Sequence, residues 1–200
     1  MKKILSILLV CFATLGFSQE KFDIEAVQQF QNKINDEYAN PKESPLLPQD
    51  FAAFITLDFY PINEKYFVVA QFVRTKKEKP FEMKTSTSRK PIYVKYGEIT
   101  FKMEGKDLKL NVYRNIELSK KVAFKDYLFL PFSDKTSGKE SYIGGKYIDL
   151  KIPKGKTISI DFNTSYNPYC AYNYKYSCPL VPLENDLAVE IKAGVKKFHN

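Results

Sequence analysis

The chain has 200 residues, with 31 lysines and arginines against 23 aspartates and glutamates, and 44% of its residues are hydrophobic. This length and composition fit one globular domain that is large enough to bury a core. Only Arg74, Arg89 and Arg114 are arginines and no nucleic-acid-binding motif occurs, so the net charge of +8 indicates a solvated lysine surface. We therefore predict no nucleic-acid partner; attraction to anionic lipid or polysaccharide is the alternative, and salt would weaken it.

The segment 1–18 has the features of a secretory signal peptide. Two lysines precede a mostly apolar run over residues 4–17, and small residues stand at the positions that favour cleavage before Gln19. Cys11 lies inside the apolar run rather than at its end, which favours cleavage over lipid anchoring. No other apolar run approaches the roughly 18 residues of a membrane span. We therefore predict export to the periplasm or the medium, with no membrane span.

A helix is predicted between residues 23 and 38, within an N-terminal region that we place at 19–43. Asp23 is suited to cap its N-terminus, and Asn40 followed by Pro41 ends it. Apolar residues recur at three- and four-residue spacing along one narrow stripe: Ile24, Val27, Phe30, Ile34 and Tyr38.

From residue 44 to residue 200 the apolar residues alternate with a period of two, which is typical of strands. Turns are expected at Gly97 and Gly105, and Asn111 is among the polar residues expected to face water. The predicted strands are 53–60, 66–73, 81–87, 91–96, 98–103, 107–113, 124–132, 142–150, 156–162 and 187–191. The fold class is therefore mainly β: a single antiparallel barrel-like or sandwich-like domain with one N-terminal helix.

Three blocks of the chain resemble a bacterial and archaeal family called domain of unknown function 1684. They are SPLLPQDFAAFITLDFYPIN (44–63), LPFSDKTSGKESYIGGKYIDL (130–150) and DFNTSYNPYCAYNYKYSCPLVPLENDLAVEIKAG (161–194). Together they cover nearly the whole predicted mature chain. The resemblance implies no activity, because the function of the family is unknown.

The chain departs from the pattern of this family at three positions. The family usually has arginine where this chain has Lys146, glutamate where it has Val195, and glycine where it has Thr56. Lys146 keeps the positive charge but loses the two-pronged hydrogen bonding of a guanidinium group. If the glutamate is catalytic in the family, Val195 argues against catalysis in this chain.

Several kinds of chemistry are excluded by residues that the sequence lacks. His199 is the only histidine and is the penultimate residue, which argues against a serine–histidine triad and against a histidine-ligated metal. No glycine-rich phosphate loop occurs, and the alternation of strands and helices typical of nucleotide-binding folds is absent. We predict no cofactor and no metal, and leave open whether the protein is an enzyme.

Cys170 and Cys178 form an even pair of cysteines around a tyrosine-rich loop. In an oxidising compartment this pattern favours a disulfide, which would stabilise the fold by roughly 2–3 kcal/mol. A metal site and a reactive thiol are the alternatives.

Polar residues cluster where the last strands begin and end. Alternation places Asp161 and Asn163 on the same face of one strand. We take as candidates for ligand binding Asp161, Asn163, Asn167, Glu184 and Asn185. If the β-scaffold brings Asp161, Asn163 and Glu184 together, they could supply a carboxylate pair for hydrolysis or oxygen ligands for a hard cation such as calcium. The alternative is structural, because Asp and Asn next to turns commonly bond the backbone.

A second polar group surrounds the turn after residue 132. It comprises Asp134, Thr136, Tyr142 and Lys146, which could line the same opening as Asp161 or could only shape the turn. Closely spaced tyrosines could provide a surface that stacks on sugars or peptides, or could cover one end of the barrel: Tyr166, Tyr169, Tyr172, Tyr174 and Tyr176.

Three hypotheses of function follow from these observations. The first is a periplasmic binding module for a small polar ligand or glycan, built on residues 161–185. The second is a hydrolase-like enzyme that uses Asp161 and Glu184. The third is a structural protein of the cell envelope that binds no ligand.

Overall fold

The computed structural model describes residues 21–199, so the predicted signal peptide and its cleavage site lie outside the described residues. Within that range, no helix is both long and apolar enough to cross a membrane. The main helix α1 spans Ile24–Ala39, and the Asp23 carboxylate accepts the backbone N–H groups of Glu25 and Ala26, at 3.0 and 3.1 Å. The helix and its capping residue are therefore as predicted.

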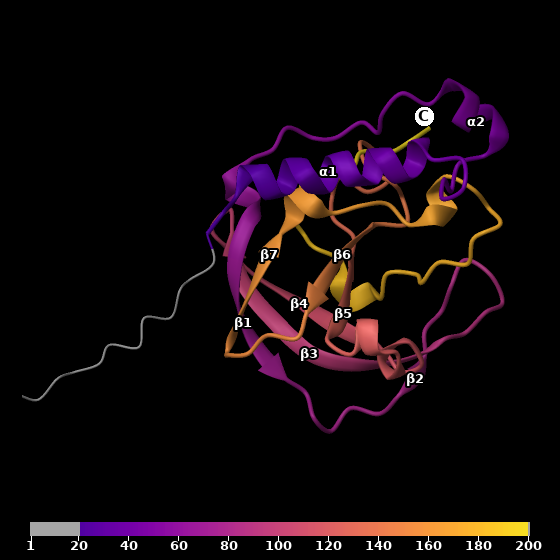
Figure 1. Ribbon diagram of the computed structural model, residues 1–200. Coiled ribbons are helices and arrows are strands. Elements are labelled where there is room, and N and C mark those ends of the chain that lie inside the picture. Colours follow the sequence, from indigo (N-terminus) through magenta and orange to yellow (C-terminus); the bar gives the residue numbers. More distant parts are fainter. Residues whose placement is uncertain (1–20, 200) are drawn as a thin grey trace, which may run out of the picture.

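Seven antiparallel strands form one curled sheet that resembles half of a barrel (Figure 1). The order is β6-β5-β4-β3-β1-β7, and the short β2 pairs with β3. Helix α1 crosses the molecule on the side of β6 and β7, the two edge strands (Figure 1). The strands are β1 Phe67–Arg74, β2 Phe81–Glu82, β3 Ile92–Met103, β4 Lys106–Asn115, β5 Tyr127–Phe132, β6 Lys146–Lys151 and β7 Thr157–Asp161. The predicted fold class is confirmed.

The main core fills the concave side of the curled sheet. Alternating residues of β3 and β4 point into it, as the sequence predicts: Ile99, Phe101, Met103, Leu108, Leu110 and Val112. Leu187, Val189 and Ile191 join this core from the C-terminal segment. A second cluster packs α1 against the C-terminal region through Ile34, Tyr38 and Tyr172.

Two predicted strands are wrong. Residues 53–60 do not pair in a ladder: Pro48 opens a short helix α2, Pro48–Ala53, and only Phe59 forms a bridge, with Val195. Residues 187–191 alternate between buried and exposed positions without joining the sheet. Their backbone bonds to the turn after β5, through Leu187 N–H to the Ser133 carbonyl and through the Val189 carbonyl, and not to a strand ladder.

The predicted turn at Gly97 is also wrong. β3 runs continuously through this position, and the register with β4 shifts there in a β-bulge. The Phe72 ring packs so closely on Gly97 that a side chain would collide with it. The turn at Gly105 is present between β3 and β4, where the φ of Gly105 is 74°.

Candidate functional site

The polar residues near the turn after β5 form a buried network of hydrogen bonds rather than the wall of an open ligand site. Lys146 is fully buried; its Nζ donates to the carbonyls of Ile191 (2.9 Å) and Ala193 (3.2 Å), and lies 3.4 Å from Asp134 Oδ2. Burial lowers the pKa of Lys146, and the Asp134 carboxylate opposes that shift. Asp134 Oδ1 accepts the backbone N–H groups of Thr136 and Ile191. These contacts connect the C-terminal segment to β6.

Asp161 and Asn163 are hydrogen-bonded neighbours, but they do not share a strand face: β7 ends at Asp161, and Asn163 lies in a short 3-10 helix, Phe162–Thr164. Asn163 is 1% exposed, and its side chain bonds both the N–H and the carbonyl of Asn63, each at 3.0 Å. Asp161 Oδ1 accepts the backbone and side-chain N–H groups of Asn163. Burial raises the pKa of Asp161, and the hydrogen bonds from Asn163 oppose this rise.

The remaining candidates lie apart from Asp161. Glu184 is exposed on a short 3-10 helix, Leu183–Asn185, and does not line the cavity that Asp161 lines beside the start of α1. Asn185 and Asn167 are fully buried, and Asn167 Nδ2 donates to the carbonyl of Lys196 (2.8 Å). Tyr142 is half-buried, with its hydroxyl 3.9 Å from Cys170 Sγ. The structure does not bring the nine predicted ligand-binding residues into one opening.

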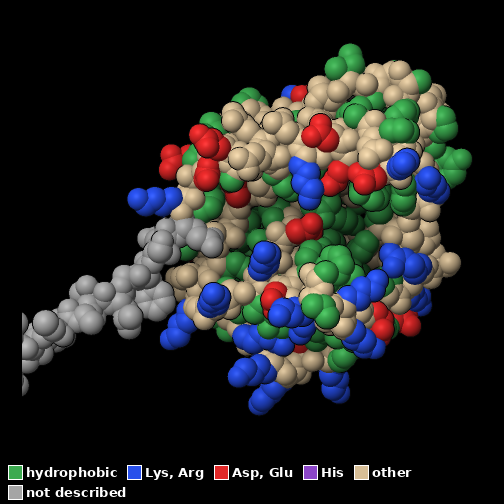
Figure 2. Space-filling view, in the orientation of Figure 1, with side chains coloured by type: hydrophobic (Ala, Val, Ile, Leu, Met, Phe, Trp, Pro, Cys, Tyr) green, Lys and Arg blue, Asp and Glu red, His purple; other side chains and the backbone are tan. Residues whose placement is uncertain are grey.

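A different group of residues encloses a cavity of about 430 Å³ between α1, the sheet and the C-terminal loop. We call it the aromatic pocket. Figure 2 shows the hollow beneath α1, with hydrophobic side chains inside it. Its walls come from α1 (Phe30, Lys33, Ile34, Glu37, Tyr38), from the sheet and its flank (Tyr93, Leu118, Tyr127, Phe129, Tyr147, Asp149), and from the loop (Tyr166, Pro168, Tyr169, Tyr176, Ser177, Cys178, Pro179).

Strand alternation explains the floor of the aromatic pocket. Tyr127 and Phe129 are two residues apart on β5, and Tyr147 and Asp149 are two residues apart on β6, so each pair lies on one face of the sheet. Leu128, between the first pair, points into the main core on the other face. The same two strands therefore build both the core and the pocket.

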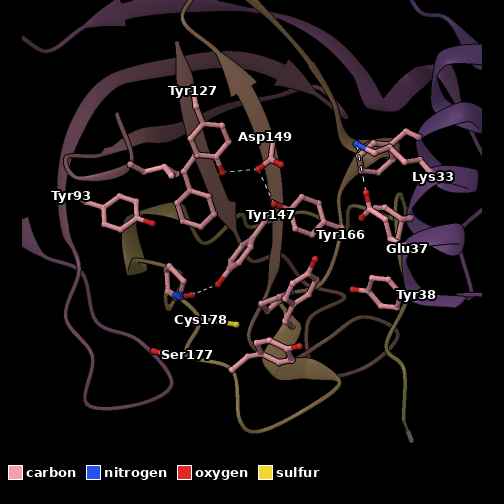
Figure 3. A pocket seen from close by; sticks show the side chains of 18 residues that line it. Lys33, Glu37, Tyr38, Tyr93, Tyr127, Tyr147, Asp149, Tyr166, Ser177 and Cys178 are labelled. Carbon is pink, nitrogen blue, oxygen red and sulfur yellow. Dashed lines mark hydrogen bonds and ion pairs between the residues drawn. The ribbon is translucent and has the colours of Figure 1, made fainter. Parts of the chain in front are cut away.

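Asp149 contributes a solvent-exposed carboxylate to the floor of the pocket. Its Oδ1 accepts hydrogen bonds from the hydroxyls of Tyr127 and Tyr166, both at 2.7 Å (Figure 3). The Tyr147 hydroxyl donates to the carbonyl of Pro179. Burial raises the pKa of all three tyrosines well above the ordinary value, so they remain neutral donors.

Three of the five loop tyrosines line the pocket, namely Tyr166, Tyr169 and Tyr176. Tyr172 is buried and packs edge to face on Tyr38 of α1, at 4.9 Å between ring centroids, whereas Tyr174 is 84% exposed. Only part of the predicted stacking surface is therefore present, because the five tyrosines point to more than one side of the loop. Sequence reasoning missed Asp149, although a carboxylate between the apolar Ile148 and Leu150 of one strand is a signal that could have indicated it.

The two cysteines are free thiols in the structure, so the predicted disulfide is not formed there. They are neighbours, because the backbone N–H of Cys170 lies 3.2 Å from Cys178 Sγ. The hydrogen bond from Cys178 lowers the pKa of Cys170 to about 6 and raises that of Cys178. The lowered pKa of Cys170 favours its thiolate form. Cys178 lines the aromatic pocket.

The aromatic pocket is equipped for binding. Of its described lining residues, Lys33, Glu37 and Asp149 are the ones charged at neutral pH, and Lys33 pairs with Glu37 at 3.6 Å. No group of three or more His, Cys, Asp or Glu side chains suited to a metal ion occurs within residues 21–199. A pocket of this size, with aromatic rings as half of its lining residues and a few placed polar groups, is typical of small-ligand sites.

Comparisons with known proteins agree with this fold. The solution NMR structure of an uncharacterized protein from Haloarcula marismortui is similar, with 29% sequence identity and a TM-score of 0.67 over 86% of this chain and 92% of that one. No curated protein matches the chain. Residues 52–196 match a family described as a protein of unknown function, DUF1684. The chain belongs to this DUF1684 family.

Proposed function

We propose that the protein is an exported, non-catalytic binding module that holds a small polar ligand or glycan in the aromatic pocket. The observation that carries this proposal is the floor of the pocket, where one carboxylate, Asp149, is fixed by two tyrosine hydroxyls among aromatic rings. Such placed polar groups in an apolar cavity orient a ligand and make binding specific. The family fixes no function, so the proposal rests on this geometry.

The pocket supports binding better than hydrolysis. The carboxylates proposed for a hydrolase, Asp161 and Glu184, do not share a cavity, although glycoside hydrolysis needs two carboxylates facing one bond. Within the aromatic pocket the hydrogen-bond partners of Asp149 are two tyrosines, whereas Asp161 lines a separate cavity that Asp149 also borders. The loop 161–185 still contributes to the proposed site, because it supplies Tyr166, Tyr169 and Tyr176.

Two-dimensional amide NMR of the mature chain tests the proposal. The probes are choline, its neutral carbon analogue with a tert-butyl group in place of trimethylammonium, glucosamine and glucose. At least one probe should shift the amide signals of Tyr147, Asp149 and Tyr166 in a saturable way.

A pair of tryptophan variants locates the binding. Leu118→Trp fills the pocket from its flank and should abolish these shifts, because Leu118 lines the cavity. Val122→Trp is the matched control, since Val122 is 85% exposed outside the aromatic pocket. Shifts that survive in Leu118→Trp, or pocket amides that respond to none of the probes, would overturn the proposal.

A further inference from the structure

Each tyrosine hydroxyl on the floor of the aromatic pocket already donates its proton in a hydrogen bond within the protein. Tyr127 and Tyr166 donate to Asp149 Oδ1, and Tyr147 donates to the Pro179 carbonyl. A hydroxyl has one proton and two lone pairs, so these three groups present lone pairs to anything else that binds beside them. The floor therefore offers hydrogen-bond acceptors and favours a ligand that donates.

The net charge of the residues that line the pocket also favours a cationic ligand. Lys33 and Glu37 lie one turn apart on α1 and form an ion pair at 3.6 Å, so their charges cancel. Asp149 then supplies the net negative charge of the residues that line the pocket. An anionic ligand would meet this carboxylate without a free cation in the lining to balance it.

The aromatic rings add a surface that attracts cations. The Tyr147 ring stands nearly perpendicular to those of Phe129 (4.7 Å between centroids, 78°) and Tyr166 (5.9 Å, 86°). Perpendicular packing turns ring faces in different directions, and a ring face attracts a cation within about 6 Å of its centroid. Among the pocket rings of the described chain, the one that has a lysine or arginine over it is Tyr176, with Lys175 at 5.0 Å.

We propose that the ligand of the aromatic pocket carries an organic ammonium group, which pairs with the Asp149 carboxylate and packs against the faces of the surrounding rings. This inference rests on the proposed function and specifies its ligand class. A neutral sugar hydroxyl can also donate to these oxygens, but it carries no positive charge to pair with the Asp149 carboxylate. An alkylammonium group matches both the acceptors and the ring faces.

Titration calorimetry of the mature chain compares each ammonium probe with its neutral counterpart. Choline is measured against its tert-butyl analogue, which has the same shape without the charge, and glucosamine against glucose. The first pair tests a quaternary ammonium and the second a primary amine on a sugar. We expect at least one charged probe to bind roughly tenfold or more tightly than its neutral partner.

Asp149→Asn tests the role of the carboxylate. Asparagine keeps an oxygen that accepts the two tyrosine hydroxyls but removes the charge, so the preference for the ammonium probe should fall at least about tenfold. Asp107→Asn is the control, because Asp107 is an exposed carboxylate in the β3–β4 hairpin, paired with Lys102 outside the aromatic pocket. It should leave both affinities unchanged.

The outcomes separate this inference from the proposed function. If the neutral probes shift the pocket amides and bind as tightly as the charged ones, the ammonium inference fails and the binding module stands. If Asp149→Asn retains the full preference for the charged probe, the inference also fails. If no probe shifts the pocket, both proposals fall. The comparison of charged and neutral probes on the unmodified chain needs no variant to fold.

Discussion

The side chain of Asn185 pairs with the backbone of Asn111 as a neighbouring strand would. Its Oδ1 accepts the Asn111 N–H at 2.8 Å, and its Nδ2 donates to the Asn111 carbonyl at 2.9 Å and also to the carbonyl of Pro131. Pro131 lies in β5, an interior strand, and has no N–H to give to β4. β4 and β5 pair only at Tyr113 opposite Phe129, and Asn185 supplies the bonds where they separate.

Replacement of Asn185 should therefore destabilise the whole fold. Asn185→Ala leaves two buried groups of Asn111 and one of Pro131 without these bonds, and we expect the free energy of unfolding to fall by about 3 kcal/mol or more. Urea denaturation followed by circular dichroism measures this loss. Asn32→Ala, at an exposed position of α1, should change stability little. An equal effect of the two variants would contradict the bridging role.

The buried ion pair between Lys146 and Asp134 gives a second prediction. Lys146→Met removes the cation but leaves Asp134 buried, so we expect a loss of roughly 3 kcal/mol in the free energy of unfolding. Lys135→Met is the matched control at an exposed neighbouring position. A Lys146→Met protein as stable as the control would show that the pair does not hold the C-terminal segment to β6.

The pH dependence of Cys170 reactivity should show the effect of the hydrogen bond from Cys178. The hydrogen bond from Cys178 lowers the pKa of Cys170 to about 6, so its thiolate fraction, and with it the rate of alkylation by iodoacetamide, should rise with pH to a midpoint near that value. Cys178→Ala removes the donor and should move the midpoint upward, toward the range of an ordinary thiol. An unchanged midpoint in Cys178→Ala would refute this assignment.

The same two thiols should close into the predicted disulfide in an oxidising medium. In the reaction with oxidised glutathione, the two cysteines lose two hydrogens and the glutathione disulfide is reduced to two thiols. The Cys170 thiolate attacks first and Cys178 completes the exchange. Intact mass spectrometry should find the chain two hydrogens lighter, and Cys170→Ser should instead stay at its reduced mass or carry glutathione. Persistent free thiols in the unmodified chain would count against the disulfide.

Much of the fold could be predicted because it depends on local patterns. The stripe of α1, its Asp23 cap and the alternation of residues 98–113 are all encoded within a few neighbouring residues. The errors occurred where contacts with residues distant in the sequence determine the local structure. Asn111 was expected to face water, but it is 5% exposed because Asn185, 74 residues away in sequence, binds its backbone. Gly97 marks a bulge rather than a turn because Phe72 packs onto it.

The candidate site was harder to predict for a related reason. The clustered polar residues that the sequence analysis selected, such as Asn163 and Asn185, turn out to have a structural role, because their side chains bond the backbone of other segments. Asp149 is one of several polar residues of β6, and its place in the pocket becomes evident when Tyr127 from β5 and Tyr166 from the loop bond to it. No spacing along the chain encodes that meeting. The five loop tyrosines indicated an aromatic surface, and three of them line the pocket.

Native mass spectrometry of the protein, recovered from its host cells under mild conditions, tests the central claim most directly. The unmodified chain and Val122→Trp should both retain a small-molecule mass that leaves on denaturation, and Leu118→Trp should be bare. An added mass that Leu118→Trp retains equally would contradict the claim. So would a bare unmodified chain whose pocket amides respond to none of the four NMR probes.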